Sequence, residues 1–251
     1  MIPFNVTLTI MKAIVTGHTR GLGAAIAGEL LGRHIPVLAL ARHRNTELAQ
    51  RFTAGLEQVE LDLADTGSLE DWLAGDTLAG FLAGSPSVLL INNAGVVQPV
   101  GPLTAQDVTS IARAVAINVT APMVLSRAVI AASPAAGDRR ILHVSSGAGR
   151  NAYPGWSVYC ATKAALDHHA RAVVLDRLPG VRICSLAPGV IDTDMQAEIR
   201  ATSLDNFPLR ERFEAMKREG SLTSPEDCAR RLVDYALGAR FGEVAVADLR
   251  D

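Results

Sequence analysis

One stretch near the start of the chain restricts its fold more than any other. An apolar run, Ala13–Thr16, passes directly into a turn that contains Gly17, Gly21 and Gly23, and a helical pattern follows at once. Glycine lets a backbone turn sharply there, and it lets an anion such as a pyrophosphate approach the free N–H groups at the helix N-terminus. A tight strand–helix turn without a ligand is the alternative interpretation, so the rest of the chain has to decide between the two.

The rest of the chain repeats this alternation of short apolar strands and amphipathic helices. Strands are predicted at 13–16, 36–41, 58–61, 87–91, 140–144, 181–186 and 243–247. Helices are predicted at 22–33, 104–120, 123–132, 156–178, 194–201, 208–218 and 225–237, with a break at Pro122. Alternating strands and helices with right-handed crossovers predict an α/β fold, a doubly wound parallel sheet of the Rossmann type.

The alternation is interrupted once, close to the C-terminus. Residues 190–220 are polar, helical in patches and without a strand, which predicts a helical lid inserted into a single domain spanning residues 12–251. Residues 1–11 precede the first strand and lack the features of a signal peptide. Because Met11 opens an ordinary start, they are interpreted as an N-terminal extension or as the product of a mis-assigned start codon.

Composition narrows the class of protein. The 251 residues are 49% hydrophobic and carry a formal charge of −2, which argues against binding to nucleic acid. The chain lacks an apolar run of about 18 residues, so a membrane span is not expected. Three cysteines, an odd number and none in a CxxC motif, favour reduced thiols and a cytoplasmic location.

Further motifs follow the glycine turn in a fixed order. They are Asn92-Asn93-Ala94-Gly95 after the fourth strand, Asn118 in the next helix, Ser145-Ser146 after the fifth strand, Tyr159 and Lys163 in a YxxxK pattern, and Pro188-Gly189 after the sixth strand. Together with the TGxxxGxG turn, they resemble the short-chain dehydrogenase/reductase family over roughly residues 12–248. This resemblance implies an oxidoreductase that uses a nicotinamide dinucleotide.

Tyr159 and Lys163 carry the clearest chemical signal. Residues four apart on a helix project from one face, so the lysine ammonium is expected near the tyrosine hydroxyl. A nearby ammonium and a positively charged nicotinamide ring favour the phenolate and lower the tyrosine pKa from about 10, which makes the side chain a usable general acid. The resemblance further implies that Ser146 positions the substrate carbonyl and that Asn118 completes a water-linked proton relay to Lys163. For Asn118, a hydrogen bond at a helix kink near Pro122 is the alternative.

Charge around the second strand indicates which cofactor is used. That strand ends Ala41-Arg42-His43-Arg44 without the acidic residue that NAD-preferring relatives use, and Arg20 adds a cation in the glycine turn. Guanidinium groups match a phosphate in bidentate geometry, so NADP(H) is predicted, although ordinary solvated arginines are the alternative.

The resemblance assigns two further residues to the cofactor. Asp62 is expected at the adenine and Thr193 at the nicotinamide carboxamide, and for both a capping role is the alternative. The full predicted cofactor set is Gly17, Thr19, Arg20, Gly21, Leu22, Gly23, Arg42, Asp62, Asn93, Ala94, Gly95, Tyr159, Lys163, Pro188, Gly189, Val190 and Thr193. Neither Cys160 nor the adjacent pair His168-His169 is assigned a chemical role, and no metal is predicted.

Two segments, residues 144–156 and 187–197, resemble the sepiapterin reductase branch of the family and its bacterial benzil reductases. Such enzymes reduce one carbonyl of a vicinal diketone or of a pterin side chain. Substrate contacts are predicted at Ser146, Tyr153, Trp156, Tyr159 and Met195, with Phe207 as a further apolar wall residue. For Tyr153, Trp156, Met195 and Phe207, packing between lid and core is the alternative. Asp248 is the nearest candidate for the acidic pterin anchor of sepiapterin reductases, but it does not align with that position.

Two other activities remain open, an alcohol dehydrogenase working in the oxidative direction and a non-catalytic NADP(H) sensor. The partner expected in every case is a small molecule, with a carbonyl compound favoured. Family members commonly pair through the helices that here contain Asn118 and Tyr159, so the resemblance implies a homodimer or homotetramer.

Overall fold

The computed structural model describes residues 11–251, so the predicted N-terminal extension lies outside the described residues apart from Met11. Seven strands form one sheet in the order β3-β2-β1-β4-β5-β6-β7, with every neighbouring pair parallel. The strands are β1 Met11–Thr16, β2 Val37–Ala41, β3 Leu56–Glu60, β4 Ser87–Asn92, β5 Asp138–Val144, β6 Val181–Ala187 and β7 Val246–Asp248. The predicted doubly wound parallel sheet is therefore confirmed.

Ten α-helices cover and extend this sheet in the described part of the chain. They are α1 Gly21–Gly32, α2 Thr46–Arg51, α3 Thr66–Ala74, α4 Thr77–Leu82, α5 Val108–Val115, α6 Ala121–Ala132, α7 Ser157–Leu175, α8 Asp194–Ala201, α9 Arg210–Arg218 and α10 Pro225–Leu237. Short 3₁₀ turns occur at Leu103–Ala105 and Gly147–Gly149, and a π turn spans Ala116–Thr120.

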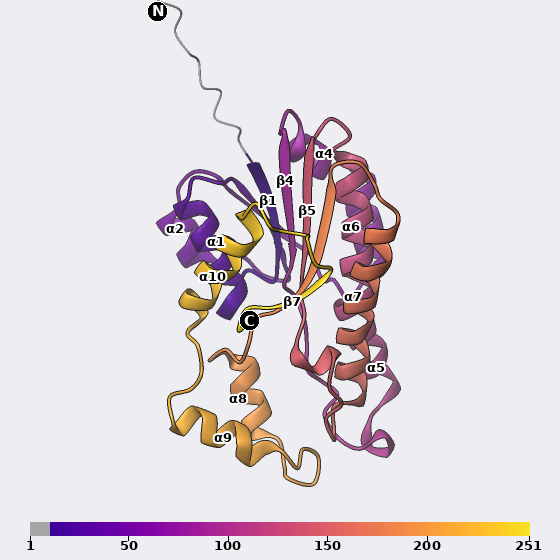
Figure 1. Cartoon of the computed structure of the whole chain (residues 1–251), viewed down its shortest axis with the longest axis vertical. Helices are drawn as coiled ribbons and strands as arrows, with labels where there is room; N and C mark the ends of the chain where they lie inside the picture. Colours follow the sequence, from indigo (N-terminus) through magenta and orange to yellow (C-terminus); the bar gives the residue numbers. More distant parts are fainter. Residues whose placement is uncertain (1–10) are drawn as a thin grey trace, which may run out of the picture.

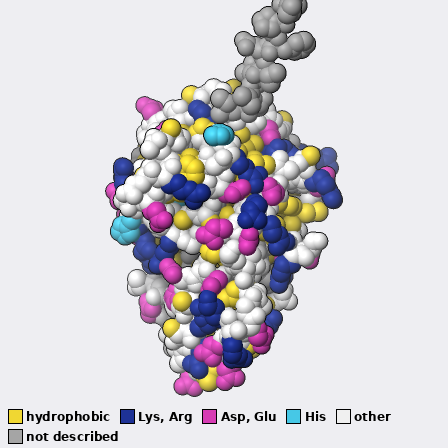
Figure 2. Space-filling view, turned by 90° about the vertical axis from the view of Figure 1, so that its left-hand side faces the viewer, with side chains coloured by type: hydrophobic (Ala, Val, Ile, Leu, Met, Phe, Trp, Pro, Cys, Tyr) yellow, Lys and Arg dark blue, Asp and Glu magenta, His cyan; other side chains and the backbone are white. Residues whose placement is uncertain are grey.

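The helices pack in two layers on the sheet (Figure 1). One hydrophobic core lies between the sheet and α1, α2 and α10, and a second lies between the sheet and α3, α4, α6 and α7. Strand β4 is buried throughout its apolar length because both layers cover it, as its uninterrupted apolar run predicts. The outer face of the first layer carries positive and negative side chains interspersed with one another (Figure 2).

The predicted break at Pro122 is wrong. A single helical segment runs from Val108 to Ala132, and it begins at Val108 because the side chain of Asp107 accepts a hydrogen bond from the N–H of Ser110. Proline has no N–H to donate to the preceding turn, and the π turn at Ala116–Thr120 accommodates this loss without ending the helix.

This segment is also long and apolar enough, by composition alone, to cross a membrane, with a mean hydropathy of 1.6. The segment is apolar because it packs on the sheet: Ala121, Leu125 and Val129 are buried in the second hydrophobic core. The segment has the character of a core helix.

Two other differences come from local geometry. Helix α7 ends at Leu175, before the predicted Leu178, where Arg177 adopts a left-handed backbone with a φ of 50°. Helices α2, α3 and α4 were not predicted, since each is short and partly buried. Asn45 and Asp65 cap the first two of them, accepting hydrogen bonds from Leu48 and Ser68.

Helices α8 and α9 lie beyond the carboxyl ends of the strands, where Figure 1 shows them below the sheet. They occupy the segment for which a lid is predicted, and a third hydrophobic cluster, which includes Trp156, Ile199 and Phe207, fills the space beneath them. The two ends of the lid meet in an isolated parallel bridge between Ile191 and Thr223.

Candidate active site

A cavity of about 450 Å³ opens at the carboxyl ends of the strands, where the strand order reverses between β1 and β4. Doubly wound sheets bind ligands at this switch point. Every residue of the predicted cofactor set lines the cavity, and so do the predicted substrate residues Ser146, Tyr153, Trp156, Tyr159 and Met195. One continuous cavity therefore collects nearly all the residues that the motifs single out.

The glycine turn has the geometry that a bound pyrophosphate needs. Gly17 has a φ of 76°, and a Cβ on Gly23 would lie 2.0 Å from the carbonyl oxygen of Gly17, so no side chain fits at position 23. The side chain of Arg20 makes no capping hydrogen bond at the start of α1. The N-terminal N–H groups of that helix are therefore available to an anion in the cavity. The residues present fit a dinucleotide cofactor.

The Asn92-Asn93-Ala94-Gly95 motif is fixed to the same turn. The Thr16 hydroxyl accepts hydrogen bonds from the backbone N–H groups of Asn93 (3.0 Å) and Ala94 (2.9 Å), and the Asn93 amide donates to the Thr16 carbonyl at 2.9 Å. These bonds hold the ends of β1 and β4 together at the floor of the cavity.

Ser146, Tyr159 and Lys163 meet deeper in the cavity. Ser146 follows β5, while Tyr159 and Lys163 lie one turn apart on α7. The Lys163 ammonium donates a hydrogen bond to the Val144 carbonyl at 2.8 Å and lies 5.7 Å from the centre of the Tyr159 ring. The neighbouring Ser145 differs from Ser146, since its hydroxyl donates to the buried Asp167 carboxylate at 2.7 Å.

The expectation of a lowered tyrosine pKa is not met in this structure. Burial raises the pKa of Tyr159 to about 12, although its hydrogen bond with Ser146 acts in the opposite direction. Burial also lowers the pKa of Lys163 to about 8, against the opposing charge of Asp167. Desolvation is the largest influence on both pKa values, because both groups are buried.

Asn118 does not line the cavity. It lies in the π turn behind it, 1% exposed, where its side chain accepts from the N–H of Val96 at 2.9 Å and donates to the Val96 carbonyl at 2.8 Å. A Cβ on Gly95 would lie 3.4 Å from Asn118 Oδ1 and 3.5 Å from Lys163 Nζ. The side chain therefore does not bond the helix at Pro122, and it approaches Lys163 across Gly95.

The predicted phosphate-binding arginines differ in their contacts. Arg42 is exposed at the end of β2 and lines the cavity. Arg20 forms an ion pair with Asp194 of the lid at 2.9 Å, and because both side chains are about 70% exposed this pair is weak.

The structure adds Arg113, which sequence reasoning missed, to the cavity lining beside Asp62. Its guanidinium contacts the Asp62 carboxylate at 3.2 Å, and the Asp62 side chain also accepts from the N–H of Ala64. Asp62 thus lines the cavity and caps a turn as well. Thr193 occupies the N-cap position of α8 without a capping hydrogen bond, so its hydroxyl is not used by the helix.

Aromatic side chains form the wall of the cavity opposite the glycine turn. The Trp156 ring lies edge-on to the rings of Tyr153 and Tyr159, with centroid separations of 5.5 and 5.4 Å. It stacks on the Phe207 ring with a centroid separation of 4.6 Å. Phe207 is fully buried behind Trp156 and does not line the cavity, so its predicted place in the substrate wall is wrong. Phe207 packs between the lid and the core instead, and the Trp156 ring separates it from the cavity.

Two charged groups at the site were not predicted. Asp167, 1% exposed, accepts hydrogen bonds from Ser145 and Ser185, both at 2.7 Å, and lies one turn beyond Lys163 on α7. Arg250 at the C-terminus lines the cavity, whereas Asp248 faces arginines instead. The only signal in the sequence was position: Asp167 follows Lys163 by one helical turn, and Arg250 follows the last strand.

The comparisons with known proteins agree with this geometry. The family model for short chain dehydrogenase matches residues 11–204. The chain belongs to this family. Benzil reductase ((S)-benzoin forming) of Bacillus cereus is 37% identical, covering 94% of this chain and 98% of the relative, and sepiapterin reductase of Meriones unguiculatus is 30% identical over 95% of each.

Among solved structures, a short-chain dehydrogenase/reductase from Burkholderia vietnamiensis is 49% identical, with a TM-score of 0.71, covering 97% of this chain and 98% of its own. The predicted resemblance to the benzil and sepiapterin reductase branch is therefore confirmed. As a family member, the chain is an oxidoreductase that uses a nicotinamide dinucleotide.

Proposed function

We propose that this short-chain dehydrogenase uses NADPH to reduce one ketone of a vicinal diketone to an alcohol. The observation that carries the proposal is the meeting of Ser146, Tyr159 and Lys163 in the cavity that the glycine turn opens. Similarity to benzil and sepiapterin reductases supports the substrate class. A bound reduced nicotinamide supplies the hydride.

The roles follow from the contacts of each side chain. The Ser146 and Tyr159 hydroxyls, which share a hydrogen bond, donate to the substrate carbonyl oxygen and orient it. Tyr159 gives its proton to that oxygen as negative charge develops there. The Lys163 ammonium stabilises the phenolate left behind, and Asn118 positions Lys163 through water near Gly95.

The direction of the reaction is proposed from the similarity to benzil and sepiapterin reductases, which favours reduction over the oxidative alternative. Burial keeps Tyr159 protonated at neutral pH, so a proton is present for the substrate oxygen. The intact Ser146, Tyr159 and Lys163 set favours an enzyme over a sensor.

Cofactor choice rests on Arg42, with Arg20 as a second cation once its weak pair with Asp194 opens. Arg42 lines the cavity at the end of β2, and Arg20 lines it at the glycine turn. Arg42 is free to bind a 2′-phosphate. Thr193 and Asp62 are proposed to contact the nicotinamide carboxamide and the adenine. A cytoplasmic location, which the free cysteines favour, is part of the same proposal.

The test is steady-state oxidation of NADPH and NADH with benzil, 1-phenyl-1,2-propanedione and sepiapterin, for wild type and for Tyr159→Phe. Rapid NADPH turnover on the diketones that is lost in Tyr159→Phe supports the proposal. Tight NADPH binding without turnover of any of the three would contradict it.

A further inference from the structure

Arg250 reaches the cavity from the extreme C-terminus of the chain. The backbone after β7 continues beside the end of β6, where the N–H of Leu249 donates to the Ala187 carbonyl at 2.9 Å. The Arg250 side chain then crosses the positive-φ residue Gly189, with its Cδ 3.6 Å from the place a Cβ on that glycine would take. Gly189 belongs to the predicted cofactor set, and both Gly189 and Arg250 line the cavity that also contains Ser146 and Tyr159.

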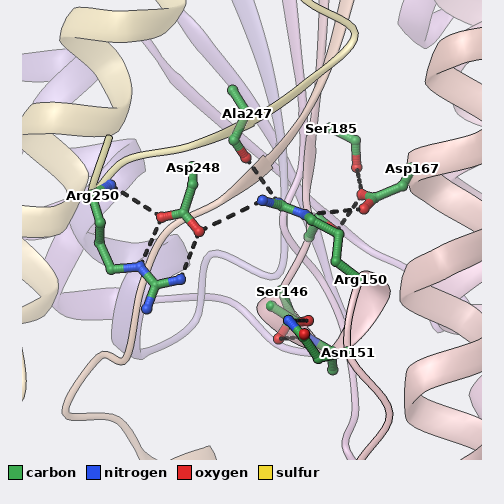
Figure 3. Close-up of polar contacts among 11 residues, drawn as sticks. Ser146, Arg150, Asn151, Asp167, Ser185, Ala247, Asp248 and Arg250 are labelled. Atoms are coloured by element: carbon green, nitrogen blue, oxygen red, sulfur yellow. Dashed lines mark hydrogen bonds and ion pairs between the residues drawn. The ribbon is translucent and has the colours of Figure 1, made fainter.

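A network of charges fixes this guanidinium in place (Figure 3). Arg250 donates from Nε to Asp248 Oδ1 at 2.8 Å and from Nη2 to Asp248 Oδ2 at 2.6 Å. Asp248 is held in turn by Arg150, whose Nη1 lies 3.6 Å away and whose Nη2 donates to the Ala247 carbonyl at 2.9 Å. The Asp248 side chain is only 6% exposed, so this pair is better shielded than a surface ion pair.

The same network of ion pairs extends to the loop that follows Ser146. Arg150 follows the turn Gly147–Gly149 directly after Ser146, and its Nε lies 3.4 Å from Asp167 Oδ2. Arg250 is therefore connected to the loop after Ser146 through Asp248 and Arg150 (Figure 3). The bidentate pair with Asp248 uses Nε and Nη2, and within residues 11–251 no hydrogen bond uses Nη1.

We propose that Arg250 is the specificity residue of this site, binding through its guanidinium the acceptor oxygen on the carbon next to the reacting carbonyl. This inference rests on the proposed reduction of a carbonyl held by Ser146 and Tyr159. The oxygen belongs either to the second ketone of a vicinal diketone or to the carboxylate of a 2-oxo acid. Both present the same acceptor to a fixed cation.

The contacts of Asp248 exclude the opposite arrangement. A cationic substrate group would need a free carboxylate on the C-terminal residues 248–251. Asp248, however, forms ion pairs with Arg150 and Arg250 and does not line the cavity. The charged lining residues of α8 and α9, which are Asp194, Glu198 and Arg212, come from a different segment than Arg250. The C-terminal residues therefore present a positive charge to the substrate.

The experiment compares wild type with Arg250→Met on three substrates. They are 1-phenyl-1,2-propanedione, phenylglyoxylate, and 2,2,2-trifluoroacetophenone, an activated ketone without a second acceptor carbonyl. Loss of one charge-assisted hydrogen bond predicts that the ratio of kcat/KM for the dione to that for trifluoroacetophenone falls about 10- to 100-fold. The matched control is Arg240→Met, since Arg240 is exposed, pairs with Glu243 and lies outside the cavity.

Binding supplies a readout that does not depend on turnover. Phenylglyoxylate is titrated against NADP-loaded protein by fluorescence of Trp156, and its Kd is expected to rise at least about tenfold in Arg250→Met. Asp248→Asn, which loosens Arg250 without removing it, is expected to give a smaller shift in the same direction. An equal loss on all three substrates together with an unchanged Kd would overturn the inference.

The two proposals fail in different ways. If the dione is not reduced but phenylglyoxylate binds in an Arg250-dependent manner, the diketone function is wrong and the role of Arg250 stands with a carboxylate as its ligand. If the dione is reduced equally well by wild type and Arg250→Met, relative to trifluoroacetophenone, the function stands and the role of Arg250 is wrong.

Discussion

Burial of single ionisable side chains decides how this site responds to pH. The Lys163 ammonium is present below its pKa of about 8 and is lost as the pH rises through that value, while Tyr159 keeps its proton up to about 12. We expect kcat/KM for reduction to fall above about pH 8, because the phenolate then forms without its counter-ion. Lys163→Arg, whose guanidinium stays charged, is expected to move this fall to higher pH. A profile that stays level to pH 10 in wild type would contradict the assignment.

Asp167 acts on the same titration from one turn away, as a positioning residue. Its charge raises the pKa of Lys163, so Asp167→Asn is expected to move the alkaline fall to lower pH. It also accepts from two buried serines and lies near Arg150, so the free energy of unfolding is expected to drop by about 1–3 kcal/mol. The pH profile and urea unfolding of the same variant check the two effects, and a purely structural role would leave the profile in place.

Arg42 is the residue on which cofactor choice is expected to depend. Arg42→Asp replaces a phosphate-binding cation with an acceptor for a ribose hydroxyl, so the preference for NADPH over NADH should fall by about 100-fold. The ratio of kcat/KM values for the two cofactors measures this. Arg44→Asp, two residues on and outside the cavity, is the matched control and should leave the ratio within about threefold.

The sequence motifs predict which residues line the cavity, but they do not predict which other side chains those residues contact. The residues from Gly17 to Thr193 that the sequence assigns to the cofactor all line one cavity, because motifs at the ends of parallel strands must converge. Sequence reasoning missed the raised pKa of Tyr159, the Asp62–Arg113 pair and the place of Arg250. Those depend on burial and on contacts between distant segments, which no local pattern encodes.

Among the elements, the lid depends most on one aromatic stack. Phe207 is fully buried beneath Trp156, and their rings lie nearly parallel at an angle of 10°. Phe207→Ala leaves a cavity there and is expected to reduce the free energy of unfolding by about 3–5 kcal/mol, measured by urea denaturation. Phe207→Leu should cost clearly less. A change below about 1 kcal/mol for the alanine variant would show that the lid unfolds separately from the sheet.

The elements themselves were predictable where a periodic pattern was long. Helix α10 has the predicted bounds, and Ser224 caps it by accepting a hydrogen bond from the N–H of Asp227. The helix from Val108 to Ala132 runs through Pro122, at which the sequence predicts a break, because the preceding π turn accommodates the proline. Hydrogen bonds shifted by one residue within a helix leave little trace in hydrophobic spacing.

For the whole molecule, exposed apolar side chains support the proposed oligomer. Val108 and Val115 on α5 and Val174 and Leu175 on α7 are exposed, and these two helices lie against each other. We expect a dimer or tetramer that buries this surface. Leu175→Asp is expected to give a monomer by size-exclusion chromatography with light scattering. Val244→Asp, at an exposed apolar position on neither helix, should not change the mass.

The lid is joined to the rest of the fold by two chain segments that are hydrogen-bonded to each other. The N–H of Asp192 donates to the Thr223 carbonyl at 2.9 Å, and the N–H of Thr223 donates to the Val190 carbonyl at 3.0 Å. The segment thus leaves and re-enters the fold at one point, as an insert between two adjoining anchors. Evolution or an engineer can exchange the residues that follow Thr193 as a cassette, changing which molecules are accepted while Ser146, Tyr159 and Lys163 stay in place.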